Sequence, residues 1–465
     1  MSLVFFNTLT RQKEEFVPIE SGKVKMYTCG PTVYDYPHIG NYRTFLFEDL
    51  LRRYLKYKGF QVTQVMNLTD IDDKIIIGSQ KKGISLDEYT APYKKIFFED
   101  LNTLNAEASE FYPEATKHIK EMVKIIKKLL GKKHAYEIEG SIYFKISTFP
   151  EYGKLSKMNL EELKVGTRVK ADEYEKEQVS DFALWKAWDE KDGDIFWETE
   201  IGKGRPGWHI ECSAMSMKYL GEYFDIHTGG VDNIFPHHEN EIAQSQCATG
   251  KKFVNFWLHA EHLLVDNKRM AKRYGNFYTL RDLLDKGWYP MAIRYLLLST
   301  YYRQQLNFTL EGLEAAKNSL QRIFDFSDQL ETIEKEGKNP QAERLVISAK
   351  EKFEAGLDDD LNVSIGLAAI FDLIYEVNKL LRENQVSKTD AQLILNQMDS
   401  FDKVLGYLKK PEESLDDKAV QLVERREKAR QDKDWQLADK IRKQLLEMGI
   451  ILEDTSAGTK WKKKI

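Results

Sequence analysis

The fold is decided by one stretch, residues 23–74, which reads KVKMYTCGPTVYDYPHIGNYRTFLFEDLLRRYLKYKGFQVTQVMNLTDIDDK. An apolar run within residues 24–27 is typical of a buried strand. Residues 45–55 then carry apolar side chains at the 3.6-residue spacing of a helix, and residues 62–66 predict a second strand. A strand, helix and strand of this length form a βαβ unit, which places its two strands parallel in one sheet.

Polar side chains follow both predicted strands. Cys29 and His38 come after the first strand, and Thr69 comes after the second. In open parallel sheets, ligands bind beyond the carboxyl ends of the strands. The sequence therefore predicts a ligand site at this edge of the sheet.

Composition limits the class of protein. A chain of 465 residues is long enough for about two to four domains, and it contains no apolar run near the roughly 20 residues that a membrane span needs. The first seven residues are too short, and too poor in flanking basic residues, for a secretory signal. The three cysteines, Cys29, Cys212 and Cys247, are widely spaced and odd in number, which argues against a disulfide framework. A reducing cytoplasm is the expected location.

The remaining sequence suggests a divided α/β domain followed by helices. Residues 135–145 alternate like a hairpin, and the piece from about 120 to 200 resembles an insertion into the larger domain. The α/β pattern resumes near residue 207, with a short strand at 224–227 broken by the residues 228–230. Helical patterns dominate from residue 280 onward.

Charge singles out the C-terminal end. The net charge of −5 argues against a nonspecific nucleic-acid coat, but residues 418–465 hold 13 basic and eight acidic side chains. This end is therefore the candidate surface for a polyanion, although interleaved charges also fit an ordinary exposed helix pair.

Two segments could bind phosphate. The turn at residues 38–41 (HIGN) precedes a helix, where Gly40 allows close approach and the imidazole of His38 can donate to a phosphate oxygen. Residues 267–273 hold four cations and could close over a triphosphate. The alternatives are a structural turn and a solvated basic loop.

A metal site is a third hypothesis. Cys29, Cys212, His237 and Glu241 supply two thiolates, an imidazole and a carboxylate, all of which Zn²⁺ accepts. His237 and Glu241 are four residues apart and so share a helix face. The alternative is that the cysteines are buried as small hydrophobic residues.

Together, five motifs closely resemble the cysteinyl-tRNA synthetase family of class I aminoacyl-tRNA synthetases. They are CGPTVYD (29–35), HIGN (38–41), NLTDIDDK (67–74), GWHIECSAM (207–215) and FPHHENEIAQS (235–245). The C-terminal residues 433–461 also resemble that family, so the resemblance covers essentially the whole chain.

The resemblance implies an α/β fold with a Rossmann-type parallel-sheet catalytic domain in two halves (1–120 and 201–250). An inserted domain (121–200) separates these halves. A connecting domain with the basic loop (251–310), a helical bundle (311–405) and an anticodon-binding domain (406–465) follow. We expect a monomer.

The resemblance also assigns roles on the ATP side. HIGN matches the family's HIGH motif with Asn41 replacing the second histidine. Residues 269–273 (RMAKR) match its K-M-S-K-S loop, with Lys272 as the second lysine and both serines replaced. The implied catalytic residues are His38, Asn41 and Lys272. The implied ATP-binding residues are Gly30, His38, Gly40, Asn41, Gly230, Asp232 and Lys272.

On the amino-acid side, the resemblance makes Cys29, Cys212, His237 and Glu241 ligands of one Zn²⁺ that also binds the substrate thiol. Cysteine would contact Cys29, Thr69, Trp208 and His227. Zn²⁺ separates cysteine from serine well because thiolate is the better ligand, whereas a pocket that reads shape separates them poorly.

The implied reaction has two steps. Cysteine and MgATP give cysteinyl-adenylate and pyrophosphate, and the cysteinyl group then passes to tRNA(Cys). Two alternatives remain: an ATP-dependent ligase joining cysteine to an amino sugar, and a non-catalytic tRNA-binding relative. The C-terminal segment argues against the first, and the complete set of predicted zinc and pocket residues argues against the second.

Overall fold

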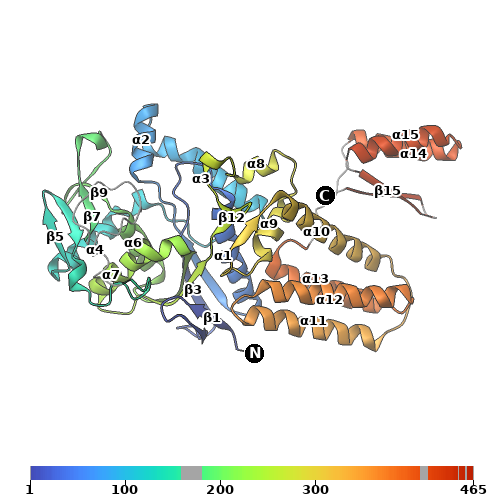
Figure 1. Cartoon of the computed structure of the whole chain (residues 1–465), viewed down its shortest axis with the longest axis horizontal. Coiled ribbons are helices and arrows are strands. Elements are labelled where there is room, and N and C mark those ends of the chain that lie inside the picture. The colour runs from blue at the N-terminus through green and yellow to red at the C-terminus, as the bar shows by residue number, and fades with distance from the viewer. Residues whose placement is uncertain (1, 159–180, 409–416, 449, 456–457, 464–465) are drawn as a thin grey trace.

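The structure is a computed structural model that describes residues 2–158, 181–408, 417–448, 450–455 and 458–463 (Figure 1). Its catalytic half is built on a parallel sheet in the order β11-β10-β3-β4. The strands are β3 (Lys23–Thr28), β4 (Gln61–Met66), β10 (Phe224–Gly230) and β11 (Val254–Ala260). α1 (Ile39–Tyr57) connects β3 to β4, which confirms the predicted βαβ unit.

The predicted break at residues 228–230 is wrong. β10 continues through Gly230, because β11 pairs with it as far as Gly230 and Ala260. A Cβ atom at Gly229 would lie 2.9 Å from the ring of His238. This glycine makes room for a buried histidine and does not end the strand.

Five strands between residues 135 and 206 form a separate antiparallel sheet in the order β5-β6-β7-β9-β8, which Figure 1 shows at the end away from the helical bundle. The hairpin predicted at 135–145 is confirmed by the pairing of β5 with β6. The strands are β5 (Ala135–Ile138), β6 (Ser141–Phe144), β7 (Phe182–Ala187), β8 (Trp197–Thr199) and β9 (Gly202–Pro206).

Helices complete the catalytic half around this framework. Before the inserted sheet come α2 (Asp73–Lys82), α3 (Leu86–Thr103) and α4 (Ile119–Gly131). After it come α6 (Trp208–Leu220), the π-helical turn η5 (Ile234–His238) and α7 (Glu239–Thr249). At the N-terminus, β1 (Val4–Asn7) and β2 (Gln12–Glu15) form an antiparallel pair.

A small sheet, β13-β12-β14, links the catalytic half to the helices (Figure 1). It comprises β12 (Leu263–Val265), β13 (Lys268–Arg269) and β14 (Leu306–Phe308). The helices are α8 (Leu280–Leu284), α9 (Pro290–Ser299), α10 (Leu310–Glu331), α11 (Pro340–Asp358), α12 (Val363–Arg382) and α13 (Lys388–Leu405). The described C-terminal elements are α14 (Asp417–Gln431), α15 (Trp435–Glu447), β15 (Ile450–Thr455) and β16 (Gly458–Lys463).

α1 is enclosed by the sheet on one side and by α9 and α13 on the other, so several of its charged residues are buried. Arg294 of α9 donates to Asp49 Oδ2 at 2.5 Å and to the carbonyl oxygen of Leu405 at 2.8 Å. Arg53 of α1 also donates to Asp49 Oδ2, at 2.8 Å, so two arginines share this buried carboxylate. The contact with Arg294 fixes the helix that begins at the HIGN turn against the bundle.

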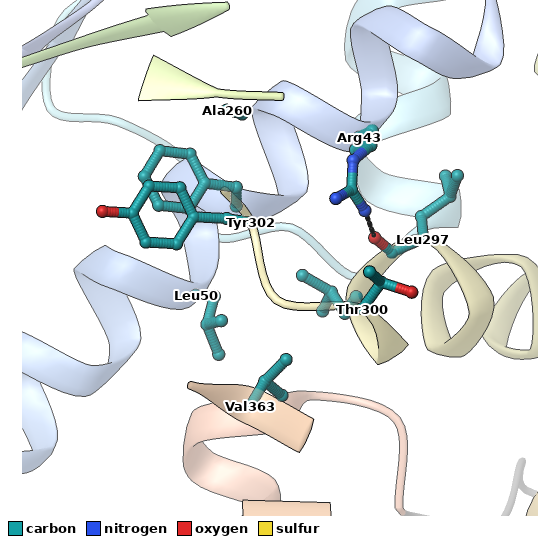
Figure 2. A pocket seen from close by; sticks show the side chains of 9 residues that line it. Arg43, Leu50, Ala260, Leu297, Thr300, Tyr302 and Val363 are labelled. Carbon is teal, nitrogen blue, oxygen red and sulfur yellow. Dashed lines mark hydrogen bonds between the residues drawn. The ribbon is translucent and has the colours of Figure 1, made fainter. Parts of the chain in front are cut away.

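A second buried arginine reinforces the same junction. Figure 2 shows Arg43 pointing into a pocket between α1, α9 and α12, where it donates to the carbonyl oxygen of Leu297 at 2.9 Å. Arg43 also donates to the carbonyl oxygens of Glu261, Tyr301 and Gln304. Burial lowers its pKa to about 10, which leaves it charged at neutral pH.

Among the described residues, no helix is both long enough and apolar enough to cross a membrane.

Candidate active site

The four predicted metal ligands converge at the carboxyl end of the sheet. Cys29 follows β3, Cys212 lies in α6, His237 lies in η5 and Glu241 lies in α7. One ligand atom from each of these residues lies within 4.8 Å of the others. Cys29 is partly exposed, whereas the other three are buried. The cluster is therefore a largely buried set of donors.

The donor set fits a metal ion. Glu241 Oε1 is buried and has no hydrogen-bond partner among the described residues, although it lies 3.2 Å from His237 Nε2. In the protein alone, burial raises the pKa of Glu241 and of Cys212 and lowers that of His237. A hydrogen bond with Cys212 raises the pKa of Cys29. A divalent cation favours the thiolate and carboxylate forms and so opposes these shifts.

Further histidines surround the cluster, and sequence reasoning did not assign them. His209 Nδ1 lies 2.9 Å from His237 Nδ1, and His238 Nε2 lies 3.3 Å from Cys29 Sγ. His238 Nδ1 in turn contacts His259 Nε2 at 2.8 Å. His209 and His238 lie within the motifs 207–215 and 235–245, next to Trp208 and His237, and that position was the available signal. These contacts orient the metal ligands from outside.

A second overlapping donor set exists. His227 and His238 could join Cys29 and Glu241, and their ligand atoms also lie within 4.8 Å. However, His227 already contacts Thr228 O and Glu241 Oε2 with its two ring nitrogens. The set with two thiols suits Zn²⁺ better, because thiolates are its strongest protein ligands.

The predicted amino-acid pocket borders the cluster. The Trp208 indole stacks on His237 with ring centroids 4.4 Å apart, and the His227 ring stacks on Trp257 at 4.5 Å. Thr69 Oγ1 donates to Glu211 Oε2 at 3.1 Å. Glu211 is 1% exposed and was not predicted. The residues predicted to contact cysteine thus include two stacked aromatic rings and a buried hydroxyl–carboxyl pair.

His38 is the N-cap of α1 and forms a capping box with Asn41. Its Nδ1 accepts from the Asn41 backbone N–H at 3.1 Å, while its own N–H donates to Asn41 Oδ1 at 3.0 Å. Burial lowers the pKa of His38, so the ring is neutral. With Nδ1 accepting, the proton is on Nε2, which can donate to an oxygen of a ligand. The side-chain oxygen of Asn41 serves the cap.

The predicted glycines are required by close packing. A Cβ atom at Gly30 would lie 1.8 Å from the Asn67 carbonyl oxygen, and one at Gly230 would lie 2.3 Å from Asp232 Oδ1. A Cβ atom at Gly40 would lie 3.0 Å from the His38 ring. Asp232 is exposed in the short turn after β10. A side chain at any of these three positions would displace a neighbouring residue at this edge of the sheet.

The basic loop reaches the same edge from the other side. Lys272 Nζ lies 2.8 Å from Asp35 Oδ2, in the turn after β3, and the two side chains are 68% and 39% exposed. The stem of the loop lies against the start of α1, since the N–H of Ile39 donates to the Tyr278 carbonyl at 3.0 Å. Sequence reasoning identified Lys272 but not Asp35 as its partner.

The fold and the site define a class I aminoacyl-tRNA synthetase. Residues 15–318 match the model for the tRNA synthetases class I (C) catalytic domain, and residues 352–409 match the DALR domain. A Mycobacterium tuberculosis methionyl-tRNA synthetase bound by methionyl-adenylate has the same fold, with a TM-score of 0.59, 13% identity and coverage of 82% of this chain and 90% of that one. A putative arginyl-tRNA synthetase from Campylobacter jejuni has a TM-score of 0.55 and 16% identity, with coverage of 84% of this chain and 94% of that one.

The chain belongs to the cysteine–tRNA ligase family. Residues 412–461 match the cysteinyl-tRNA ligase anticodon binding domain. The cysteine–tRNA ligase of Protochlamydia amoebophila is 54% identical over 99% of this chain and 98% of its own length. That of Brachyspira hyodysenteriae is 51% identical over 99% of each chain. The predicted family, fold class and enzyme class are confirmed.

Proposed function

We propose that this aminoacyl-tRNA ligase activates L-cysteine with MgATP, selects it through Zn²⁺ and transfers it to tRNA(Cys). The convergence of Cys29, Cys212, His237 and Glu241 within 4.8 Å supports this most directly. These four residues would hold Zn²⁺, which when bound would supply a Lewis acid that favours a thiolate over a serine hydroxyl.

The amino-acid pocket orients the rest of the substrate. In this proposal, Trp208 and His227 lie beside the substrate cysteine next to the cluster, and the hydroxyl of Thr69 lies at the same edge of the sheet. Cys29 and His38 both follow β3, so the amino-acid and ATP sides of the site share one edge of the sheet. Holding cysteine and ATP in fixed relative positions makes adenylate formation effectively unimolecular and lowers its activation barrier.

In the first step, a carboxylate oxygen of cysteine bonds to the α-phosphorus of ATP. The bond from this phosphorus to the bridging oxygen breaks, and pyrophosphate leaves with the electron pair. In this proposal, Nε2–H of neutral His38 donates to a phosphate oxygen, and Lys272 neutralises the leaving pyrophosphate. Gly40 and Gly230 let the backbone approach the nucleotide closely, and Gly30 serves packing against Asn67.

In the second step, the terminal ribose hydroxyl of the tRNA attacks the carbonyl carbon of the adenylate and AMP leaves. The match of residues 412–461 to an anticodon-binding domain supports tRNA as acceptor over a small amino sugar. Cytoplasmic action as a monomer remains part of the proposal.

ATP–pyrophosphate exchange tests the proposal. Exchange should depend on cysteine, be far weaker with serine, and fall when zinc is removed by a chelator and return when zinc is restored. Exchange that survives complete zinc removal would contradict a substrate-binding role for the metal. The absence of exchange from zinc-loaded protein would contradict activation itself.

A further inference from the structure

One buried amide, that of Asn276, holds the base of the loop that carries Lys272. Asn276 is 9% exposed. Its Oδ1 accepts from the backbone N–H of Ala271 at 3.0 Å, and its Nδ2 donates to the carbonyl oxygen of Arg269 at 3.2 Å. A longer contact of 3.5 Å joins Nδ2 to the carbonyl oxygen of Val265, at the end of β12. The side chain thus connects the end of β12, the end of β13 and the loop backbone at Ala271.

The chemistry of these contacts requires an amide. Both an acceptor and two donors are needed on one short side chain, and asparagine supplies them. An aspartate would keep the acceptor but direct negative charge at two carbonyl oxygens. The preceding Gly275 has a φ of +66°, a conformation that glycine adopts without strain and that returns the chain toward the loop. The turn at Gly275 therefore brings the side-chain amide of Asn276 to the backbone of residues 269–271.

Asn276 lies between the two groups that act on ATP. On one side, Ala271 has no polar side chain that could fix its own backbone, and the next residue is Lys272. On the other side, Phe277 packs against the His38 ring with centroids 5.5 Å apart, and Tyr278 accepts the Ile39 N–H. A change at Asn276 would therefore shift Lys272 relative to His38.

We propose that Asn276 is a positioning residue for adenylate formation. By fixing the backbone of residues 269–271, it directs Lys272 toward the edge of the sheet occupied by His38 and Asp35. It contacts neither the metal cluster nor the amino-acid pocket in the described structure. This inference rests on the proposed role of Lys272, and it predicts an effect on one step of the reaction only.

The test compares Asn276→Ala and Asn276→Asp with the wild type. Adenylate formation, measured by ATP–pyrophosphate exchange and stopped flow, should slow by about tenfold to a hundredfold, as expected for misplacement of a catalytic group. Zinc content, the KM for cysteine and single-turnover transfer from isolated enzyme-bound adenylate should stay at wild-type values. Trypsin should cleave the loop faster in both variants, because Lys268, Arg269, Lys272 and Arg273 lie within it.

Tyr274→Ala is the matched control, because Tyr274 is 57% exposed in the same loop. It should leave adenylate formation near the wild-type rate. Wild-type adenylate formation in Asn276→Ala would overturn the inference. So would a parallel loss of zinc, transfer and thermal stability, which would mark a purely structural residue. Exchange by the wild type with cysteine tests the proposed function separately, so a failure of either idea can be distinguished.

Discussion

The two halves of the candidate site are built in opposite ways. In the candidate metal half, Cys212, His237 and Glu241 are buried, and His237 and Glu241 each contact a further histidine. In the ATP half, Lys272 is 68% exposed, pairs with Asp35 and lies over the Phe277 ring. Discrimination between a thiol and a hydroxyl needs donors fixed in a dry site, whereas a departing pyrophosphate needs a cation that can exchange partners. The difference predicts that substitutions will separate into distinct kinetic classes.

The largest effect is expected in the metal half. Cys212→Ser should lower zinc content and cysteine activation together, with activation falling by more than about a hundredfold, because even residues that only support a metal ligand can cost up to that amount. Metal analysis and ATP–pyrophosphate exchange measure the two quantities. Cys247→Ser is the control, since Cys247 is also buried but belongs to neither donor set. Full activity in metal-free Cys212→Ser would contradict the role of the metal.

The next effect is expected in the ATP half. Lys272→Ala should slow adenylate formation by about a hundredfold, in the range seen when one transition-state donor is removed, with little change in cysteine binding. Stopped-flow measurement of adenylate formation and equilibrium binding of cysteine separate these effects. Lys268→Ala, an exposed cation in the same loop, should be nearly silent. A wild-type rate in Lys272→Ala would remove this lysine from the reaction.

A smaller effect is expected from the partner of that lysine. Asp35 competes with the triphosphate for Lys272 and adds negative charge near it, so Asp35→Asn should lower the KM for ATP by about two- to fivefold. The range follows from the roughly 1 kcal/mol limit of exposed ion pairs. Thermal stability should not change for the same reason. A raised KM would show instead that Asp35 helps to place Lys272 for ATP.

The smallest effect concerns stability and pH. Burial lowers the pKa of His259 well below its ordinary value, while its ring contacts Thr8 Oγ1 at 2.8 Å. Because the folded state binds the proton less readily than the unfolded state, the free energy of unfolding contributed by this residue is present above about pH 6.5 and falls as the pH is lowered from there. Denaturant unfolding at about pH 5 to 7 measures the slope. His259→Gln should reduce that slope, and an unchanged slope would exclude His259 as a contributor.

Local pattern was sufficient for much of the framework. The apolar period of residues 45–55 predicted α1, and the alternation at residues 135–145 predicted the β5–β6 hairpin, because both patterns report which side faces the core. The prediction ended the strand β10 too early because Gly229 and Gly230 resemble a turn. In the structure, they are glycines because a Cβ atom would collide with His238 at Gly229 and with Asp232 at Gly230. A single sequence window does not contain that information.

The sequence by itself determined the donor types, the order of the motifs and the parallel βαβ unit, since these depend on residue identity and short-range spacing. Only the tertiary structure decided which distant residues meet. Cys29 and Cys212 converge because α6 begins beside the edge of the sheet where β3 ends, and the Arg294–Asp49 contact joins α9 to α1 across the junction with the bundle. Lys272 and Asp35, and the amide of Asn276 with the loop backbone, become partners for the same reason. Such contacts arise from chain packing, where burial and hydrogen-bond satisfaction are shared among segments far apart in the sequence.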